Sequence, residues 1–178
     1  MVELVESDLA IAQAGDERAF AALLRPLVVP AFDLAYVMLR DRGAAEDVVQ
    51  EAMTQAWRRL TQLRGGETAL RPWLFTIVAN RCRAQLRLRW WRVIRRADVG
   101  VSATTATEDK IAEGVDLRLA WARLRAEERA ALFLHYCEDL TAVEVARSLG
   151  LSESAAKARI QRALVHLRTL MTEEGRNG

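Results

Sequence analysis

The C-terminal part of the chain constrains its fold most strongly, because it marks where two helices begin and end. Thr141 and Glu144 have the spacing of a capping box, in which two residues close the start of a helix reciprocally. Gly150 suits the left-handed conformation that ends many helices, and Ser152 suits the N-cap of a following one. These residues predict two helices joined by a tight turn, the pattern of a helix-turn-helix.

The second of these helices, over residues 152–171, is predicted to have one apolar and one polar face. Its apolar stripe, at helical spacing, consists of Ala156, Ile160, Ala163, Leu164, Leu167 and Met171. An ordinary amphipathic helix with a solvated basic face would show the same stripe, but the capped partner helix favours a recognition helix that enters a duplex groove. The polar side chains expected to contact DNA are those of Ser152, Ser154, Lys157, Arg159 and Arg162.

Strand signals are nearly absent from the rest of the chain, where apolar residues recur every three or four positions. The sequence therefore predicts an all-α protein. The stretch 97–114 is small, polar and without periodicity, which is typical of a flexible linker. We accordingly predict two small helical domains joined by a linker: a domain over 1–95, the linker over 96–114, and a four-helix domain over 115–178 that contains the helix-turn-helix.

The formal net charge of +2 is too small to attract nucleic acid by itself, so the position of the charges matters. A helix predicted over 44–63 exposes acidic residues near its start. The helix dipole favours acids in a first turn, which accounts for Glu46 and Asp47. Glu51 lies four residues after Asp47, however, and like charges at that spacing destabilise a helix by roughly 0.2 to 0.5 kcal/mol. A basic partner would offset this repulsion, so the candidate partner site is Glu46, Asp47, Gln50 and Glu51.

A second predicted helix, over 72–94, is strongly basic, because residues 71–96 include eight arginines and no acidic residue. Trp90 and Trp91 stand between arginines near its end. Guanidinium groups can hold a nucleic-acid backbone while aromatic rings stack on bases at ~1 to 3 kcal/mol per base, so the pattern favours contact with single-stranded DNA. A solvated basic helix end is the alternative interpretation. Asn80 is a further candidate for contacting a base.

The usual marks of an enzyme, a metal site or a membrane protein are missing from the sequence. Cys82 and Cys137 form no Cys-x-x-Cys pair, and His135 and His166 complete no ligand set, so we expect no metal and no other cofactor. No nucleophile-and-base motif or phosphate-binding glycine loop is recognisable. The N-terminus is acidic where a signal peptide would be basic, and we expect no apolar stretch of the ~20 residues that span a bilayer. A cytoplasmic protein without membrane insertion and without catalysis is predicted.

Three segments of the chain together match the pattern of a known protein family. Residues 45–51, Ala-Glu-Asp-Val-Val-Gln-Glu, with Trp57, are similar to a helix that binds RNA polymerase. Residues 71–81 are similar to a helix that reads the minus-ten promoter element, and residues 124–170 to a domain that reads the minus-thirty-five element. The chain thus resembles the bacterial sigma factors of the sigma-70 family, in particular the two-domain extracytoplasmic-function (ECF) group. The resemblance covers nearly the whole chain.

The resemblance implies a role for each candidate surface. The acidic set on 44–63 would dock on the coiled-coil clamp helices of the largest subunit of core RNA polymerase. The loop over 64–70 and Asn80 would capture a base flipped from the melted non-template strand, an extrusion that costs roughly a few kcal/mol. The recognition helix would read the upstream element as a duplex in its major groove, and a cognate anti-sigma factor would restrain the protein. The residues implied to contact the minus-ten element are Arg64, Asn80, Arg81, Arg83 and Arg87.

Two other functions stay open at the level of sequence. An autonomous helix-turn-helix regulator would bind duplex DNA strongly by itself, but it would need neither the acidic set nor the basic helix. An RNA-binding or purely interacting protein would need Asn80 and the basic helix without the recognition helix. The chain also departs from the family pattern, with Ala155 and Ala158 where threonine and serine are common and Ala126 in place of a frequent proline. Affinity for the upstream element is therefore expected to be lower or differently tuned.

Overall fold

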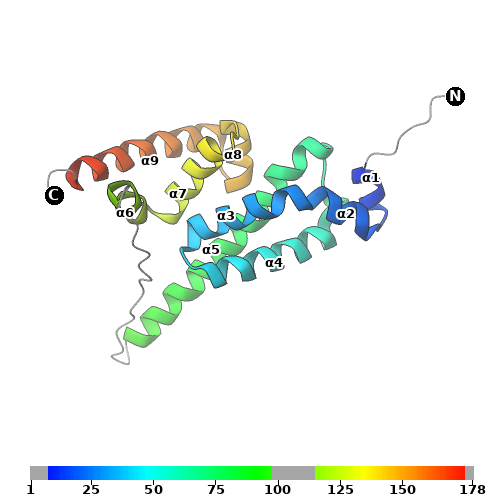
Figure 1. Ribbon diagram of the computed structural model, residues 1–178, viewed down its shortest axis with the longest axis horizontal. Coiled ribbons are helices and arrows are strands. Elements are labelled where there is room, and N and C mark those ends of the chain that lie inside the picture. Colours follow the sequence, from blue (N-terminus) through cyan, green and yellow to red (C-terminus); the bar gives the residue numbers. More distant parts are fainter. Residues whose placement is uncertain (1–7, 98–114, 175–178) are drawn as a thin grey trace.

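The structure is a computed structural model that describes residues 8–97 and 115–174, and within these ranges every regular element is a helix (Figure 1). This confirms the predicted all-α class. The first half comprises α1 (Asp8–Gln13), α2 (Glu17–Leu24), α3 (Val28–Leu39), α4 (Arg42–Arg59) and α5 (Leu70–Ala97), with short 3-10 turns at Arg25–Leu27, Leu60–Gln62 and Glu67–Ala69. The second half comprises α6 (Val115–Arg123), α7 (Ala126–Leu132), a π-helical turn η4 (Phe133–Cys137), α8 (Ala142–Leu149) and α9 (Glu153–Glu174).

In the helix-turn-helix, α8 has the predicted start and end and α9 has the predicted start, but α9 continues to Glu174, three residues past its predicted end. The Thr141 hydroxyl accepts a hydrogen bond from the Glu144 backbone N–H (3.3 Å), and the Glu144 carboxylate accepts one from the Thr141 backbone N–H (2.8 Å). Gly150 ends α8 with φ +65, and Ser152 accepts a hydrogen bond from the Ala155 backbone N–H (3.2 Å). The Thr141 hydrogen bonds hold the pKa of the Glu144 carboxyl below its usual value. These local contacts therefore fix the angle at which α9 leaves α8.

The apolar stripe of α9 is confirmed except at its end. Ala156, Ile160 and Ala163 are buried, whereas Met171 is 38% exposed and its neighbour Leu170 is buried. Two turns of an α-helix span about 7.2 residues, so the position seven residues after Ala163 stays on the buried face better than the position eight residues after it.

The boundary between α3 and α4 is set by Arg40 and Asp41. Arg40 ends α3 in the left-handed region with φ 52, and the Asp41 carboxylate accepts a hydrogen bond from the Ala44 backbone N–H (2.9 Å). That hydrogen bond is the main cause of the lowered pKa of Asp41, and Arg89 lowers it further. Capping at Asp41 lets α4 begin at Arg42, two residues before the predicted start of this helix.

One hydrophobic core runs through both halves of the molecule. It includes Leu74 and Val78 of α5 together with Val145 and Leu149 of α8. In Figure 1, α8 lies beside the N-terminal part of α5, and α7 lies beside α3. A smaller cluster within the second half joins α6, α7 and α9 through Ala120, Leu124, Leu132, Ala163 and Leu170. The helix α5 reaches Ala97, two residues into the predicted linker, and the rest of that linker lies outside the described residues.

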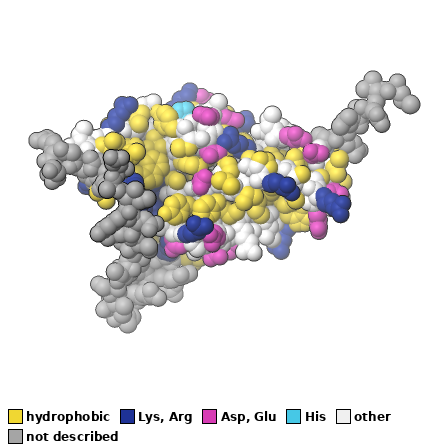
Figure 2. All heavy atoms as spheres, viewed as in Figure 1, with side chains coloured by type: hydrophobic (Ala, Val, Ile, Leu, Met, Phe, Trp, Pro, Cys, Tyr) yellow, Lys and Arg dark blue, Asp and Glu magenta, His cyan; other side chains and the backbone are white. Residues whose placement is uncertain are grey.

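The helical stretch over residues 17–39 corrects the expectation that no apolar stretch is long enough to span a bilayer. This helical stretch is long and apolar enough for a membrane span by those two criteria, although no such stretch was expected. Its apolar character has a use within the fold, because Ala31, Leu34 and Met38 are buried in the core. Other side chains of the stretch, including Val29 and Tyr36, are exposed. Figure 2 shows hydrophobic side chains over much of the face in view.

Candidate functional site

The four residues of the predicted acidic set lie together on the outer face of α4. Apolar residues at helical spacing on the opposite face of this helix, among them Val48 and Val49, are buried, which orients the set toward solvent. The exposed members are Glu46, Asp47, Gln50 and Glu51. The fold therefore presents a carboxylate-rich surface that an external basic partner can reach.

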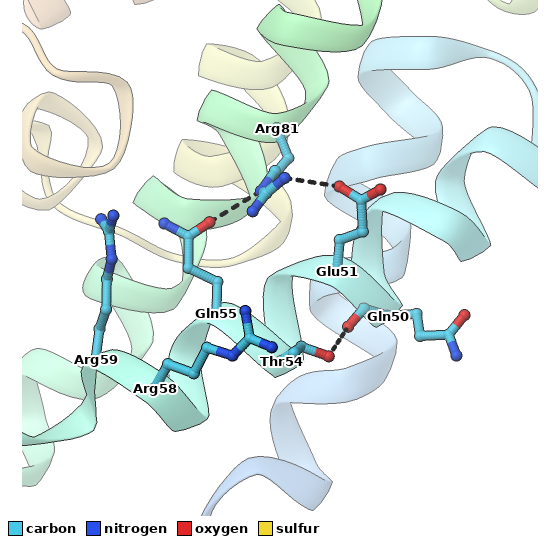
Figure 3. A pocket seen from close by; sticks show the side chains of 7 residues that line it. All are labelled: Gln50, Glu51, Thr54, Gln55, Arg58, Arg59 and Arg81. Carbon is cyan, nitrogen blue, oxygen red and sulfur yellow. Dashed lines mark hydrogen bonds and ion pairs between the residues drawn. The ribbon is translucent and has the colours of Figure 1, made fainter.

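Two carboxylates of this acidic set already have arginine partners within the chain. Arg42 pairs with Glu46 (3.0 Å) one turn along α4, and Arg81 of α5 pairs with Glu51 (2.8 Å). The Arg81 Nε also donates to Gln55 Oε1 (2.9 Å), so this side chain bridges two turns of α4 (Figure 3). Arg81 was predicted to contact DNA, but in this structure it lies beside the acidic set. It reduces the repulsion between Glu51 and Asp47.

A shallow cavity of about 460 Å³ opens where α4 and Arg81 meet (Figure 3). Its lining carries both signs of charge and several amide or hydroxyl groups, from Gln50, Glu51, Thr54, Gln55, Arg58, Arg59 and Arg81. Sequence reasoning did not single out Gln55 or Arg59. Their spacing of four and eight residues from Glu51 could have identified them, because that spacing keeps residues on one helix face.

The remaining minus-ten candidates lie at the loop before α5 and along α5 itself. Arg64 is exposed in that loop and donates to the Thr61 carbonyl (2.9 Å). Asn80 and Arg87 are exposed on α5, and Asn80 Oδ1 accepts a hydrogen bond from Arg83 Nη1 (2.7 Å). Arg83 therefore fixes the orientation of the Asn80 amide, leaving its NH₂ group as the donor available to a ligand.

Arg83 is half-buried and faces the second half of the molecule. Its Nε donates to Glu127 Oε1 (2.7 Å), and its Nη2 donates to the Leu149 carbonyl (2.9 Å). Arg159 of α9 donates to the other carboxylate oxygen of Glu127 (2.9 Å). Sequence reasoning missed Glu127, since an acid in the first turn of a helix needs no partner to explain it.

The helix α9, predicted to be a recognition helix, presents most of its candidate residues to solvent. Ser152, Ser154, Lys157 and Arg162 are exposed, whereas Arg159 is half-buried against Glu127. Lys157 pairs with Glu153 (2.6 Å) one turn earlier, which holds the ammonium group on the outer face. Hydroxyl, ammonium and guanidinium groups on one exposed helix face suit contacts with base edges and phosphates.

Neither cysteine has the features of a reactive site. Burial raises the pKa of the Cys82 thiol to about 12, and burial together with nearby acids raises the pKa of Cys137. A raised pKa disfavours the nucleophilic thiolate. Across the described ranges, no group of three or more His, Cys, Asp or Glu side chains could hold a metal ion.

Comparisons with known proteins match both halves of the chain to the sigma-70 family. The family model for sigma-70 region 2 matches residues 23–92, and the model for sigma-70, region 4 matches residues 115–167. The ECF RNA polymerase sigma factor SigL of Mycobacterium tuberculosis is 30% identical over 170 residues, which cover 91% of this chain and 96% of SigL. The ECF RNA polymerase sigma factor SigM of the same organism is 30% identical over 166 residues, 92% of this chain and 82% of SigM.

Two solved structures share the fold. The sigma factor RpoE from Bartonella quintana, in complex with the anti-sigma factor NepR, superposes with a TM-score of 0.72 and 25% identity, over 87% of this chain and 98% of RpoE. CnrH in complex with the cytosolic domain of CnrY superposes with a TM-score of 0.66 and 25% identity, over 93% of this chain and 96% of CnrH.

Proposed function

Because this chain belongs to the ECF sigma factors of the sigma-70 family, we propose that it binds core RNA polymerase through the acidic set on α4 and aims two DNA-reading surfaces at a promoter. The observation that carries the proposal is the outward orientation of the acidic set within the segment that matches region 2. The domains that perform these tasks are residues 1–95 and 115–178, joined by 96–114.

The polymerase contact is electrostatic in the first instance. The basic partner of the acidic set would be the coiled-coil clamp helices of the largest subunit of RNA polymerase. Two of the carboxylates, Glu46 and Glu51, have exposed arginine partners, and exposed ion pairs contribute only about 0 to 1 kcal/mol. These internal pairs can therefore be exchanged for pairs with the polymerase.

Promoter reading is divided between two surfaces. The loop over 64–70 and Asn80 capture a base from the melted non-template strand, and the arginines of α5 hold its backbone. The exposed face of α9 reads the minus-thirty-five element as a duplex, with Ser152 and Ser154 near base edges and Lys157 and Arg162 near phosphates. One chain thus contacts duplex and single-stranded DNA at separate places, without catalysis of its own.

Regulation by an anti-sigma factor follows from the two solved relatives, each of which was determined with an anti-sigma factor or the cytosolic domain of a partner. We infer that a cognate anti-sigma factor restrains this chain in the cytoplasm until a signal releases it.

The alternative of an autonomous regulator leaves the acidic set on α4 without a function. The experiment that separates the two functions measures the binding of core RNA polymerase to the immobilised full-length chain. In the double variant Asp47→Lys, Glu51→Lys, we expect retained polymerase to fall by at least about tenfold, since two attractive contacts become repulsive.

A matched control reverses two exposed acids away from α4, Asp8→Lys and Glu17→Lys, with the same change in net charge. This control should retain polymerase as the unchanged chain does. If the unchanged chain retains no polymerase but binds duplex DNA tightly by itself, the autonomous regulator is the correct function.

A further inference from the structure

The last turn of α4 carries two exposed arginines, Arg58 and Arg59, that the proposed function does not use. The helix dipole favours basic residues at this end of a helix. Among the described residues, however, neither side chain has an ion pair or a hydrogen bond, whereas Glu46 and Glu51 nearer the start of α4 each have an arginine partner. The described part of the chain thus leaves Arg58 and Arg59, which we term the basic end of α4, without a counter-charge.

The basic end continues the outward face that carries the acidic set. Arg58 lies eleven residues after Asp47 and seven after Glu51, spacings of about three and two helical turns that keep all three on one side of α4. All three are exposed, and Figure 3 shows Glu51 and Arg58 toward opposite ends of the part of α4 that it draws. One face of α4 therefore changes from acidic to basic along its length.

The two ends of this face are far enough apart to act as separate charges. Eleven residues at the rise of an α-helix place Asp47 and Arg58 about 16 Å apart along the axis. The Debye length at physiological ionic strength is about 8 Å, so exposed charges at this separation are largely screened from each other. A uniformly basic partner would attract Asp47 and repel Arg58. A partner must therefore match each end with side chains of its own.

The cavity of about 460 Å³ gives a partner side chain room beside the basic end. Its lining includes three arginines and one glutamate, and that glutamate, Glu51, is already paired with Arg81. A second cavity of about 400 Å³ shares Gln50, Glu51 and Arg81 with the first and reaches Asp47. The hollowed surface is thus continuous from the acidic set to the basic end. Its excess of guanidinium groups favours an incoming carboxylate, which guanidinium binds through charge-assisted hydrogen bonds.

We propose that the basic end of α4 belongs to the polymerase-docking surface and binds an acidic side chain of core RNA polymerase. The inference rests on the proposed function, because it extends the surface assigned there to the polymerase. Docking then requires a partner that is basic opposite Asp47 and Glu51 and acidic about 16 Å further along α4. The order of charges also fixes the direction in which the partner lies along α4, since the reversed direction would place like charges together.

A DNA phosphate is the other anion that arginines at this position could bind. Arg58 shares its helix face with Asp47 and Glu51, whereas Asn80, the candidate for capturing a base, is exposed on a different helix, α5. Continuity with the acidic set therefore favours a carboxylate of the polymerase over DNA.

The test is the double variant Arg58→Glu, Arg59→Glu in the full-length chain. The measurement is the retention of purified core RNA polymerase by the immobilised chain, with no DNA present. If the polymerase responded only to the total negative charge of the chain, this variant would retain more of it. We expect retention to fall about tenfold instead, because attractive contacts at the basic end become repulsive.

The matched control, Arg118→Glu, Arg168→Glu, makes the same change in net charge at exposed positions of the second half. It should retain polymerase as the unchanged chain does. A second variant, Arg58→Gln, Arg59→Gln, removes the charges without placing acids at the negative end of the helix dipole. It should lower retention about threefold, which separates a lost contact from a frayed helix end.

Retention by Arg58→Glu, Arg59→Glu that equals or exceeds that of the unchanged chain would overturn the inference, and so would an equal fall in the control. In both cases the proposed function stands if Asp47→Lys, Glu51→Lys still loses polymerase. An unchanged chain that retains no polymerase would refute the proposed function and the inference with it.

Binding of a fluorescent single-stranded oligonucleotide to the preformed complex with polymerase is measured in parallel. The inference predicts that Arg58→Gln, Arg59→Gln leaves the affinity of this complex for the oligonucleotide unchanged. A loss of oligonucleotide binding with full retention of polymerase would assign the basic end to DNA and overturn the inference.

Discussion

At the scale of single residues, the buried Arg129 guanidinium is the strongest polar anchor between α7 and α3. It donates to the Val37 carbonyl (2.6 Å) and the Met38 carbonyl (3.0 Å), near the C-terminus of α3, and also to the Leu124 carbonyl. The last carbonyls of a helix have no partner within that helix. Burial lowers the pKa of Arg129 to about 10, which leaves the side chain charged at neutral pH.

We predict that Arg129→Met lowers the free energy of unfolding by about 1 to 3 kcal/mol, because it leaves buried carbonyl oxygens without donors. Urea unfolding followed by circular dichroism measures this change. Arg168→Met removes an exposed arginine from α9 and should leave the unfolding midpoint within error of the unchanged chain. Equal midpoints for Arg129→Met and Arg168→Met would contradict the assigned role of Arg129.

At the scale of elements, the turn between α8 and α9 depends on the backbone conformation of Gly150. Residues with a Cβ rarely adopt its φ of +65. An added Cβ would nevertheless meet no atom within 4 Å. The cost of a substitution is therefore backbone strain and not a steric clash with the rest of the fold.

Gly150→Ala is expected to lower the free energy of unfolding by about 1 to 2 kcal/mol, the strain of a left-handed residue with a Cβ. Thermal unfolding of the full-length chain is the measurement. Gly43→Ala is the control, because Gly43 lies within α4 and its Cβ would meet only the Asp41 carboxylate at 3.7 Å. A Gly150→Ala midpoint at or above that of Gly43→Ala would disprove the strain.

The helix ends could be predicted from sequence because each depends on residues three or four positions apart. Thr141, Glu144 and Gly150 fix the start and end of α8 through contacts within a single turn. The acidic set on α4 was predictable for the same reason, since helical spacing alone places it on one face. The predicted start of α4 is two residues late because the sequence analysis did not identify Asp41 as the N-cap.

At the scale of the whole molecule, the contact between the two halves could not be predicted from local sequence patterns. Arg83 and Glu127 are 44 positions apart, and Arg71 and Glu138 are 67 apart. No local pattern marks such pairs, because each partner has a sufficient local explanation. The sequence analysis therefore predicted tethered domains, whereas the described residues form one continuous core across α5 and α8.

The most direct test of the central claim is transcription by purified bacterial core RNA polymerase on a pooled promoter library, with the 5′ ends of the transcripts sequenced. The account predicts that adding the full-length chain causes initiation at a distinct subset of promoters, and that Asp47→Lys, Glu51→Lys abolishes this initiation. Transcripts whose number and start sites are the same with and without the chain would contradict it.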